Sequence, residues 1–514
     1  MNTSFTRDLA LADEAATLRL GAELALFLKP GDFVALSGDL GAGKTTLARA
    51  TIRALAPGAG CFEVPSPTFT LVQAYDVTRV PVSHFDLYRI SQADEIFELG
   101  LDDALKAGVV LIEWPDRIAV YLPADRLETK LAYGPDTAGR MAVMTGHGSW
   151  GPRLERMAGI STFIDQSDWR GAVRRHLQGD ASTRRYERLE APDGRCAILM
   201  DMPAKSDEAP LRGDKSYGAL VHLADNIRAV VAMTGALRRF DLAAPEIYHY
   251  DLERGLAVIE DLGDMVFGTL QPDGSEIEQA YQAACDVLVH LAGCDCPAHL
   301  PLSDGKSHHM PHFDRDALQI EAGLVLDWFW PECKSAPADS AVRGQFEDIW
   351  NRCFDGLESE TRSLVLRDFH SPNLLWLPAR AGLQRIGLID YQDAVIGHPA
   401  YDLASLLQDA RIDVAPDREQ RHLGYYLNAR AKADGAFDAE RFQAAYAIMG
   451  AQRCSKILGI FARLNRRDGK PNYLKHMPRV SEYLERNLRH PVLAELKDWY
   501  DTHLPPEVRV PDVS

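Results

Sequence analysis

The segment Gly38-Asp39-Leu40-Gly41-Ala42-Gly43-Lys44-Thr45 decides how the first part of the chain is expected to fold. It follows the apolar run FVALS (residues 33–37) and precedes the helical pattern TLARATIRAL (residues 46–55), so it stands between a predicted strand and a predicted helix. Glycines in this setting let backbone N–H groups surround phosphate oxygens, and the helix N-terminus adds a positive dipole end. The pattern predicts a phosphate-binding loop formed by Gly38, Asp39, Gly41, Ala42, Gly43, Lys44, Thr45 and Thr46.

Two side chains of this loop have distinct expected tasks. Lys44 would reach the β- and γ-phosphates of ATP, and the Thr45 hydroxyl would bind Mg²⁺. The chain is therefore expected to use ATP and Mg²⁺ as cofactors.

Around the loop, residues 33–143 alternate short β-type runs with helical stretches, an order typical of an α/β fold with parallel strands. Two acidic residues stand at the ends of such runs, Asp86 in HFDLYR and Glu113 in VVLIEW. From strand ends they can face a nucleotide and serve a metal ion or an attacking water. The alternative is that each caps a helix or pairs with Arg89 or Arg117.

Five ordered motifs within residues 5–150 carry a resemblance to a known family: GDLGAGKTT, SPTFTLV, HFDLYR, EIFELGLDD and IEWP. Together they resemble the TsaE family, the ATPase subunit of the bacterial machinery that makes threonylcarbamoyladenosine in tRNA. The resemblance implies a P-loop ATPase that docks on the subunits of the threonylcarbamoyl-transferase complex. It also implies that Thr68 senses the γ-phosphate, that Asp86 and Glu113 serve the metal ion or the attacking water, and that Trp114 lies beside the nucleotide.

The composition limits what else the chain can bind. Its 514 residues exceed one typical domain, and 56 Lys+Arg against 74 Asp+Glu give a formal net charge of −18. So acidic a chain is not expected to grip nucleic acid with its own surface, and tRNA would be reached only through partners. The sequence contains no apolar run of about 18 residues and no signal-peptide pattern at its N-terminus, so we expect a cytoplasmic protein without a membrane partner.

A glycine- and proline-rich stretch at residues 145–162 separates this part from the rest of the chain. Beyond it, a helical stretch and several β-type runs precede a mostly helical remainder, which is typical of an α+β body with a small sheet-rich lobe and a larger helical lobe. The expected organisation is an α/β P-loop ATPase domain over residues 1–158 and an α+β two-lobed domain over residues 159–514.

The second part contains the residues that a kinase needs. In LVLRDFHSPNLLWL (residues 364–377) Asp368 precedes Asn373, and Asp390 follows in the strand-like GLIDYQDA. In kinases a positioned Asp accepts the proton of the attacking hydroxyl, while an Asn and a second Asp hold Mg²⁺ at the ATP phosphates. A helix cap and a buried ion pair are the alternative reading of the same residues.

Two further segments have the order expected of a kinase. GDASTRRY (residues 179–186) lies between β-type runs where a loop would cover phosphates, and VIEDLGD (residues 258–264) lies where a hinge would contact adenine. The second part resembles the aminoglycoside phosphotransferase and choline kinase superfamily, and is most similar to the amino-sugar anomeric kinases of the AmgK type. The resemblance implies ATP-dependent 1-phosphorylation of N-acetylmuramic acid or N-acetylglucosamine in peptidoglycan recycling.

The same resemblance assigns roles to individual residues. Asp368 would be the catalytic base, Asn373 and Asp390 would hold Mg²⁺, Ser182 would lie over the phosphates, and Glu260 to Leu262 would form the hinge.

One departure from the superfamily concerns a lysine that normally follows the phosphate loop. The strand-like AILMD (residues 197–201) contains no lysine, so Arg184, Arg185 or Lys205 would have to supply its charge. The missing lysine favours one alternative, in which the second part is a catalytically dead nucleotide-binding regulator of the ATPase. A second alternative stays open because a fold does not fix the substrate: the acceptor is an aminoglycoside, choline or another small alcohol.

Overall fold

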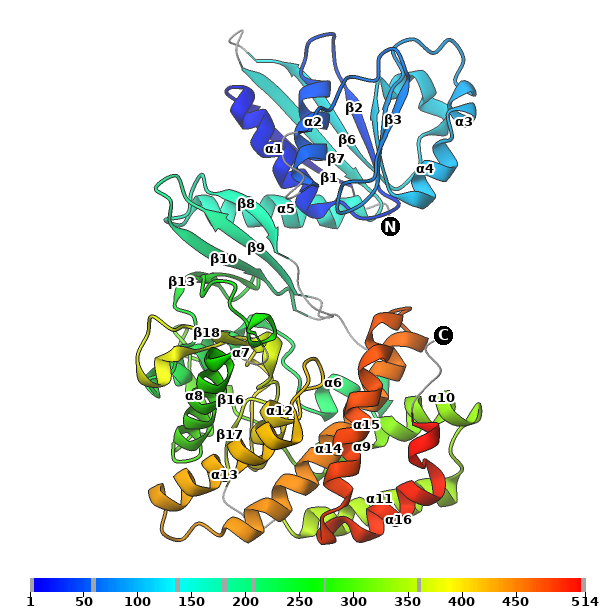
Figure 1. Ribbon diagram of the computed structural model, residues 1–514. Helices are drawn as coiled ribbons and strands as arrows, with labels where there is room; N and C mark the ends of the chain where they lie inside the picture. Colours follow the sequence, from blue (N-terminus) through cyan, green and yellow to red (C-terminus); the bar gives the residue numbers. More distant parts are fainter. Residues whose placement is uncertain are drawn as a thin grey trace. The chain divides into compact units, whose positions relative to one another are not determined.

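The structure is a computed structural model that describes residues 4–56, 62–134, 139–177, 184–204, 209–271, 274–357 and 362–509. It divides into two compact units (Figure 1). Unit 1 comprises Met1–Asp201 and His249–Ile259, and unit 2 comprises Met202–Tyr248 and Glu260–Ser514. Each unit is described separately below.

Unit 1 is built first of all around a seven-stranded mixed sheet in the order β1-β7-β6-β2-β5-β4-β3. Its strands are β1 Phe5–Leu11, β2 Phe33–Ser37, β3 Val72–Tyr75, β4 Val82–Asp86, β5 Val109–Glu113, β6 Arg126–Tyr133 and β7 Arg140–His147. Strands β6, β2, β5 and β4 run parallel to their neighbours within this group, whereas β1, β7 and β3 pair antiparallel. The α/β fold expected of the first part is confirmed.

The position of β2 in the middle of the sheet explains why its sequence is an apolar run. Val34 and Leu36 belong to one hydrophobic core cluster, whereas Phe33 and Ala35 belong to another. Because alternate side chains of a strand point to opposite faces, the sheet is covered on both faces. The covering helices are α1 Glu14–Phe27, α2 Lys44–Ala54, α3 Glu95–Glu98, α4 Leu101–Ala107 and α5 Trp150–Asp165, with the 3-10 helix η1 at Pro115–Tyr121.

Unit 1 also contains most of a second sheet, in the order β13-β14-β10-β9-β8. Its strands are β8 Val173–Leu177, β9 Arg185–Glu190, β10 Cys196–Asp201, β13 Ile247–Asp251 and β14 Leu256–Glu260. Buried side chains of this small sheet, including Leu189, Leu199 and Val258, belong to the same core cluster as Leu24 of α1 and Leu154 of α5. The two sheets of unit 1 therefore share one hydrophobic core, which we call the shared core.

Helix α5 runs without interruption from Trp150 to Asp165, so the expected boundary between residues 158 and 159 falls inside it. The helix contacts β1 and β7 of the large sheet. It also contacts the small sheet: the Phe163 ring stacks on His249 at a centroid distance of 4.7 Å, and Arg156 binds Asp201. Helix α5 thus packs against both sheets of unit 1.

Unit 2 is mostly helical. Its longest helix is α14, Ala439–Arg466, and 18 of the 28 residues of α14 are buried. The other helices are α6 Tyr217–Leu220, α7 Ile227–Arg239, α8 Ser275–Leu291, α9 Arg315–Leu324, α10 Trp330–Lys334, α11 Ser340–Asp355, α12 Ala400–Leu407, α13 Pro416–Ala433, α15 Met477–Leu488 and α16 Ala494–His503. The helical body expected of the second part is confirmed.

Four two-stranded sheets interrupt the helices of unit 2, and two of them frame the predicted catalytic segment. These two pair β17 Ser363–Val365 with β20 Val395–Gly397, and β18 Leu374–Trp376 with β19 Ile386–Leu388. The other two pair β11 Pro210–Arg212 with β12 Lys215–Ser216, and β15 His299–Pro301 with β16 Ser307–His309. Within the ranges that the structure describes, no helix has the length and apolar character needed to span a membrane.

Candidate active sites

The predicted phosphate-binding loop lies between β2 and α2, as its sequence context indicates. Gly38 has φ +134°, and a Cβ there would lie 2.1 Å from the Leu131 carbonyl oxygen. Gly43 has φ +105° and directly precedes α2. A side chain is excluded sterically at the first position and conformationally disfavoured at both, so these glycines are needed for the shape of the loop.

Lys44 follows the glycines of the loop as the first residue of α2 and is only 4% exposed. Its Nζ donates hydrogen bonds to the carbonyl oxygens of Gly38 at 2.8 Å and Asp39 at 2.9 Å, and it lies 3.8 Å from the centre of the Trp114 ring. Burial lowers the pKa of Lys44, while the nearby carboxylates Glu113, Asp86 and Asp39 oppose that shift. Trp114, expected beside the nucleotide, thus adjoins Lys44, the residue expected to bind the phosphates.

Asp86 and Glu113 stand opposite each other at the ends of the parallel strands β4 and β5. The Thr45 hydroxyl donates to Glu113 Oε2 at 2.9 Å, and the Thr68 hydroxyl donates to Asp86 Oδ2 at 2.6 Å. Both carboxylates are almost fully buried. The structure therefore brings Lys44, Thr45, Thr68, Asp86 and Glu113 together at one edge of the sheet.

His84 is a residue of this site that the sequence analysis did not single out. Its side chain is 0% exposed and its Nε2 lies 3.0 Å from Glu113 Oε1. Two sequence signals point to it: it begins the motif HFDLYR, and it stands two residues before Asp86 on the same strand, where alternate residues share a face. The two oxygens of the Glu113 carboxylate therefore have different partners: Oε1 contacts His84, and Oε2 accepts from Thr45.

In unit 2, Asp368 and Asn373 lie on one short loop between β17 and β18. The Asn373 side-chain amide donates to the Asp368 carbonyl oxygen at 3.0 Å, and the Ile389 N–H donates to the Asn373 carbonyl oxygen at 3.1 Å. The second bond joins the loop to the residue before Asp390. The three residues predicted as base and metal ligands are thereby brought together.

The Asp368 side chain is 39% exposed, and its Oδ1 lies 3.8 Å from His370 Nε2. Partial burial opposes ionisation, but His370, Lys456 and Arg367 together keep the pKa of Asp368 below its usual range. The group is accordingly a carboxylate at neutral pH, which is the form a proton acceptor requires.

The predicted hinge lies at the end of β14. The Glu260 N–H donates to the Glu246 carbonyl oxygen at 2.8 Å, and the Glu260 carboxylate accepts from Arg380 at 2.6 Å. The Leu262 side chain approaches Gly387 of β19, where an added Cβ would lie 3.0 Å from Leu262 Cδ1. Leu262 thus packs against the strand that leads to Asp390, whereas Glu260 is held by Glu246 and by Arg380.

The residues expected to replace the missing lysine give a different result. The Arg185 guanidinium donates to the Leu26 carbonyl oxygen at 3.0 Å and lies over the Phe27 ring at 4.0 Å, so it is directed to the end of α1. Arg184 directly precedes β9. Ser182 and Lys205 lie outside the described residues. In β10 itself, Asp201 is bound by Arg156 at 2.5 Å.

The oxygen donors present suit the cofactors that the motifs imply. Mg²⁺ prefers oxygen ligands, and each site offers them: Thr45, Asp86 and Glu113 in unit 1, and Asn373 with Asp390 in unit 2. The glycine loop with buried Lys44 has the chemistry of a phosphate cradle.

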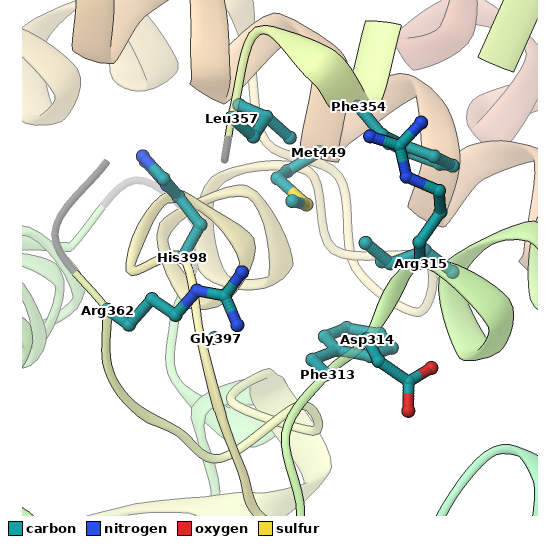
Figure 2. Close-up of a pocket in the computed structure, with 10 residues that line it drawn as sticks. Phe313, Asp314, Arg315, Phe354, Leu357, Arg362, Gly397, His398 and Met449 are labelled. Atoms are coloured by element: carbon teal, nitrogen blue, oxygen red, sulfur yellow. The ribbon is translucent and has the colours of Figure 1, made fainter. Parts of the chain in front are cut away.

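A separate pocket of about 130 Å³ in unit 2 is not one of these sites (Figure 2). Its lining includes Phe313, Arg315, Gly397 and Met449 but none of the predicted base and metal ligands. Arg315 is already bound to Asp355 at 2.5 Å. The pocket is therefore set apart from the proposed chemistry.

Comparisons with known proteins match the two parts of the chain separately. Residues 11–141 match the family described as threonylcarbamoyl adenosine biosynthesis protein TsaE, and residues 173–437 match the phosphotransferase enzyme family. An N-acetylmuramate/N-acetylglucosamine kinase of Caulobacter vibrioides is 38% identical over 364 residues, 69% of this chain and 98% of its own. A tRNA threonylcarbamoyladenosine biosynthesis protein TsaE of Rickettsia conorii is 38% identical over 140 residues, 27% of this chain and 77% of its own. Among solved structures, a Plasmodium vivax ethanolamine kinase is 11% identical, covers 67% of this chain and 89% of its own, and has a TM-score of 0.44.

Proposed function

Since the chain belongs to the TsaE family in its first part and to the phosphotransferase enzyme family in its second, we propose that it is a bifunctional enzyme. The first activity is ATP hydrolysis in support of N6-threonylcarbamoyladenosine formation in tRNA. The second is ATP-dependent phosphorylation of N-acetylmuramic acid or N-acetylglucosamine at the anomeric hydroxyl, a step of peptidoglycan recycling.

The observation that carries the ATPase proposal is the convergence of Lys44, Thr45, Asp86 and Glu113 at the end of the parallel strands. Thr45, Asp86 and Glu113 would hold Mg²⁺, which neutralises phosphate charge when bound. Lys44 binds the terminal phosphates, Thr68 contacts the γ-phosphate, and the Glu113 carboxylate orients the attacking water and accepts its proton. Trp114 covers the lysine and shields it from bulk water.

The kinase proposal rests on the loop that carries Asp368 and Asn373. A hydrogen bond joins this loop to Ile389, the residue before Asp390. Asn373 and Asp390 would hold Mg²⁺ in this second site. Asp368 accepts the proton of the acceptor hydroxyl as its oxygen attacks the γ-phosphorus. The amino-sugar acceptor is supported by the names of the relatives, of which one is 38% identical over 98% of its length.

Partners and location follow from these reactions. We propose that the ATPase part docks on subunits of the threonylcarbamoyl-transferase complex and meets tRNA only through them, because the net charge is −18. Both reactions consume ATP, so we propose that the protein acts in the cytoplasm.

The test of the kinase is formation of a phosphorylated acceptor by the full chain with ATP, Mg²⁺ and a panel of N-acetylmuramic acid, N-acetylglucosamine, an aminoglycoside and choline. NMR identifies the phosphorylated carbon. Asp368→Asn is expected to lower the rate by at least about 100-fold, because it removes the proton acceptor. A fully active Asp368→Asn variant would contradict the assignment of the base, and a product from another alcohol would change the acceptor.

The test of the ATPase is complementation of cells that depend on this gene for the tRNA modification. Lys44→Ala is expected to abolish the modified nucleoside, measured by mass spectrometry of digested tRNA, because the phosphates lose their lysine. Intact modification in Lys44→Ala cells would refute the role of the P-loop.

A second candidate for the C-terminal part is a catalytically dead nucleotide-binding regulator of the ATPase. It is favoured by the residues near the missing lysine: β10 has none, and Arg185 is directed to Leu26 and Phe27. This candidate predicts no phosphorylated product with any acceptor, whereas ATP binding by the second part would still change the rate of ATP hydrolysis by the first.

A further inference from the structure

Beneath the predicted catalytic loop of unit 2 lies a set of buried charges that the proposed mechanism does not use. Glu321 of α9 is 0% exposed and accepts a hydrogen bond from Arg367. The Lys456 ammonium of α14 lies 2.8 Å from the same oxygen, Glu321 Oε1, and the Lys456 side chain is 13% exposed. Gln452, one turn earlier on α14, donates to the other oxygen of Glu321 at 3.4 Å. One carboxylate thus joins the loop to the longest helix of the unit.

Arg367 is the residue immediately before the predicted base, and it is held in an unusual conformation. Its φ is +67°, in the left-handed region that a side chain normally avoids. Its guanidinium donates to the Val221 carbonyl oxygen at 2.8 Å as well as to Glu321, and its N–H donates to Asp402 Oδ1 at 2.9 Å. Because the side chain and the backbone of Arg367 are both fixed, the direction in which the next side chain, that of Asp368, projects from the loop is fixed as well.

Lys456 contacts two of the elements that hold the loop, α9 and α12. Besides Glu321 of α9, its Nζ donates to the Tyr401 hydroxyl of α12 at 3.3 Å. Tyr401 directly precedes Asp402, whose carboxylate accepts from the loop N–H groups of Leu366 and Arg367. A single ammonium group therefore connects the side-chain support of the loop with its backbone support.

These buried charges are a poor source of stability for the folded state. Two cations share one buried carboxylate, and removing charges from water usually costs more than an apolar packing of the same volume. The arrangement does supply fixed geometry, because each charge can be satisfied only in one place. Fixed geometry is what a loop that carries a proton acceptor needs.

From these contacts we infer that Lys456, acting through Glu321 and Tyr401, is a positioning residue that fixes the orientation of Asp368 during phosphoryl transfer. The inference rests on the proposed kinase function. Lys456 does not touch the reacting atoms, so its removal should slow the chemical step without weakening the binding of ATP or acceptor.

The experiment measures phosphorylated amino sugar formed by the full chain, a product to which the ATPase part does not contribute. Lys456→Met keeps the length of the side chain and removes its charge. It is expected to lower kcat about 10- to 100-fold, because misplacement of a catalytic group by about 1 Å has an effect of this size. The KM values for ATP and acceptor are expected to stay within threefold of wild type, a change of about 0.7 kcal/mol at most.

Two more variants complete the test. Tyr401→Phe removes only the hydroxyl that Lys456 contacts and preserves packing, so it remains informative if Lys456→Met does not fold; its kcat should fall about fivefold, the loss of one hydrogen bond. The matched control is Lys497→Met, which removes an exposed lysine paired with Asp501 on α16 and should retain the wild-type kcat.

The outcomes separate the two claims. A wild-type kcat in Lys456→Met or, where that variant is unfolded, in Tyr401→Phe would overturn the positioning role. A rise in KM with unchanged kcat would also overturn it, because it would indicate binding instead of positioning. Absence of any phosphorylated sugar from the wild-type chain would instead overturn the proposed kinase function, and this inference with it.

Discussion

At the scale of single residues, the ATPase site depends on a contact between side chains that are far apart in the sequence. His84 and Glu113 lie on neighbouring strands, and the imidazole holds one carboxylate oxygen while Thr45 holds the other. A carboxylate fixed in this way can serve a metal ion or a water in only one orientation. The histidine is thus a support for Glu113.

Replacement of this support should be visible in ATP hydrolysis. His84→Gln is expected to lower the rate about 10-fold or more, because outer partners of metal-site ligands typically have effects of this size. The measurement is phosphate release by the full chain in the absence of acceptor. The matched control is His147→Gln, since His147 also pairs with a glutamate, Glu128 at 3.3 Å, elsewhere in the same sheet. Equal rates in the two variants would contradict the role of His84.

The residue scale also separates what the sequence predicts from what it does not. The P-loop is recognisable because its glycines, Lys44 and Thr45 are adjacent in the chain, and each has a local structural reason. His84 and Glu113 are 29 positions apart in the sequence, and Glu321 and Lys456 are 135 positions apart. No local sequence pattern predicts contacts between residues so far apart. Arg185 shows the reverse problem: its place beside the predicted phosphate loop suggested a cofactor role, but its guanidinium is bound at the end of α1.

At the scale of elements, α8 and α13 of unit 2 are joined by one acidic residue. Glu278 of α8 accepts from Arg418 at 2.9 Å, Arg421 at 2.6 Å and His422 at 3.1 Å, all on α13. Partial burial opposes its ionisation, but these hydrogen bonds lower the pKa of Glu278 from 4.5 to about 2. The ionised carboxylate therefore stabilises the folded state above pH 4.5, and this contribution is lost as the pH falls from 4.5 towards 2.

The corresponding prediction concerns thermal stability. Glu278→Gln is expected to lower stability by about 1 kcal/mol at pH 7, a value limited by the partial exposure of the group. The difference in Tm from wild type should shrink when the melts are repeated near pH 3.5, because the wild-type carboxylate then starts to lose its advantage. Glu276→Gln, at an exposed position of the same helix, is the control and should show no pH-dependent difference. A constant difference at both pH values would contradict the assignment.

Element boundaries were harder to predict than element types. The alternation of short apolar runs and helical stretches correctly indicated the α/β sheet, since a strand such as β2 is buried on both faces. The glycines near residue 150 suggested a domain boundary, yet Gly151 and Gly159 lie inside α5. Tertiary packing overrides the weak helix propensity of glycine there, because α5 is covered by the two sheets of unit 1.

At the scale of the whole molecule, the two family matches do not coincide with the two compact units. The small sheet begins at β8, within the range matched by the phosphotransferase family, but its buried residues belong to the shared core of unit 1. The stability of α1 and α2 should therefore depend on residues of the small sheet, which lie in the range that matches the phosphotransferase family.

Leu199→Ala tests this dependence. Leu199 of β10 is 0% exposed in the shared core, and its truncation is expected to cost about 2–5 kcal/mol. Hydrogen exchange measured by mass spectrometry should become faster in α1 and α2 as well as in the small sheet. The matched control is Leu364→Ala in β17, a buried leucine of unit 2, which should leave exchange in α1 and α2 unchanged. Unchanged protection of α1 and α2 in Leu199→Ala would show that the two sheets unfold independently.

The uninterrupted course of α5 limits where the gene can be divided. A cut between codons 158 and 159 would divide one helix into two peptides too short to be helical alone, and each would carry away half of a common apolar surface. Separation of the two parts at this point should therefore destabilise both of them. Transfer of one activity to another host would similarly require the helix and the small sheet to travel with it.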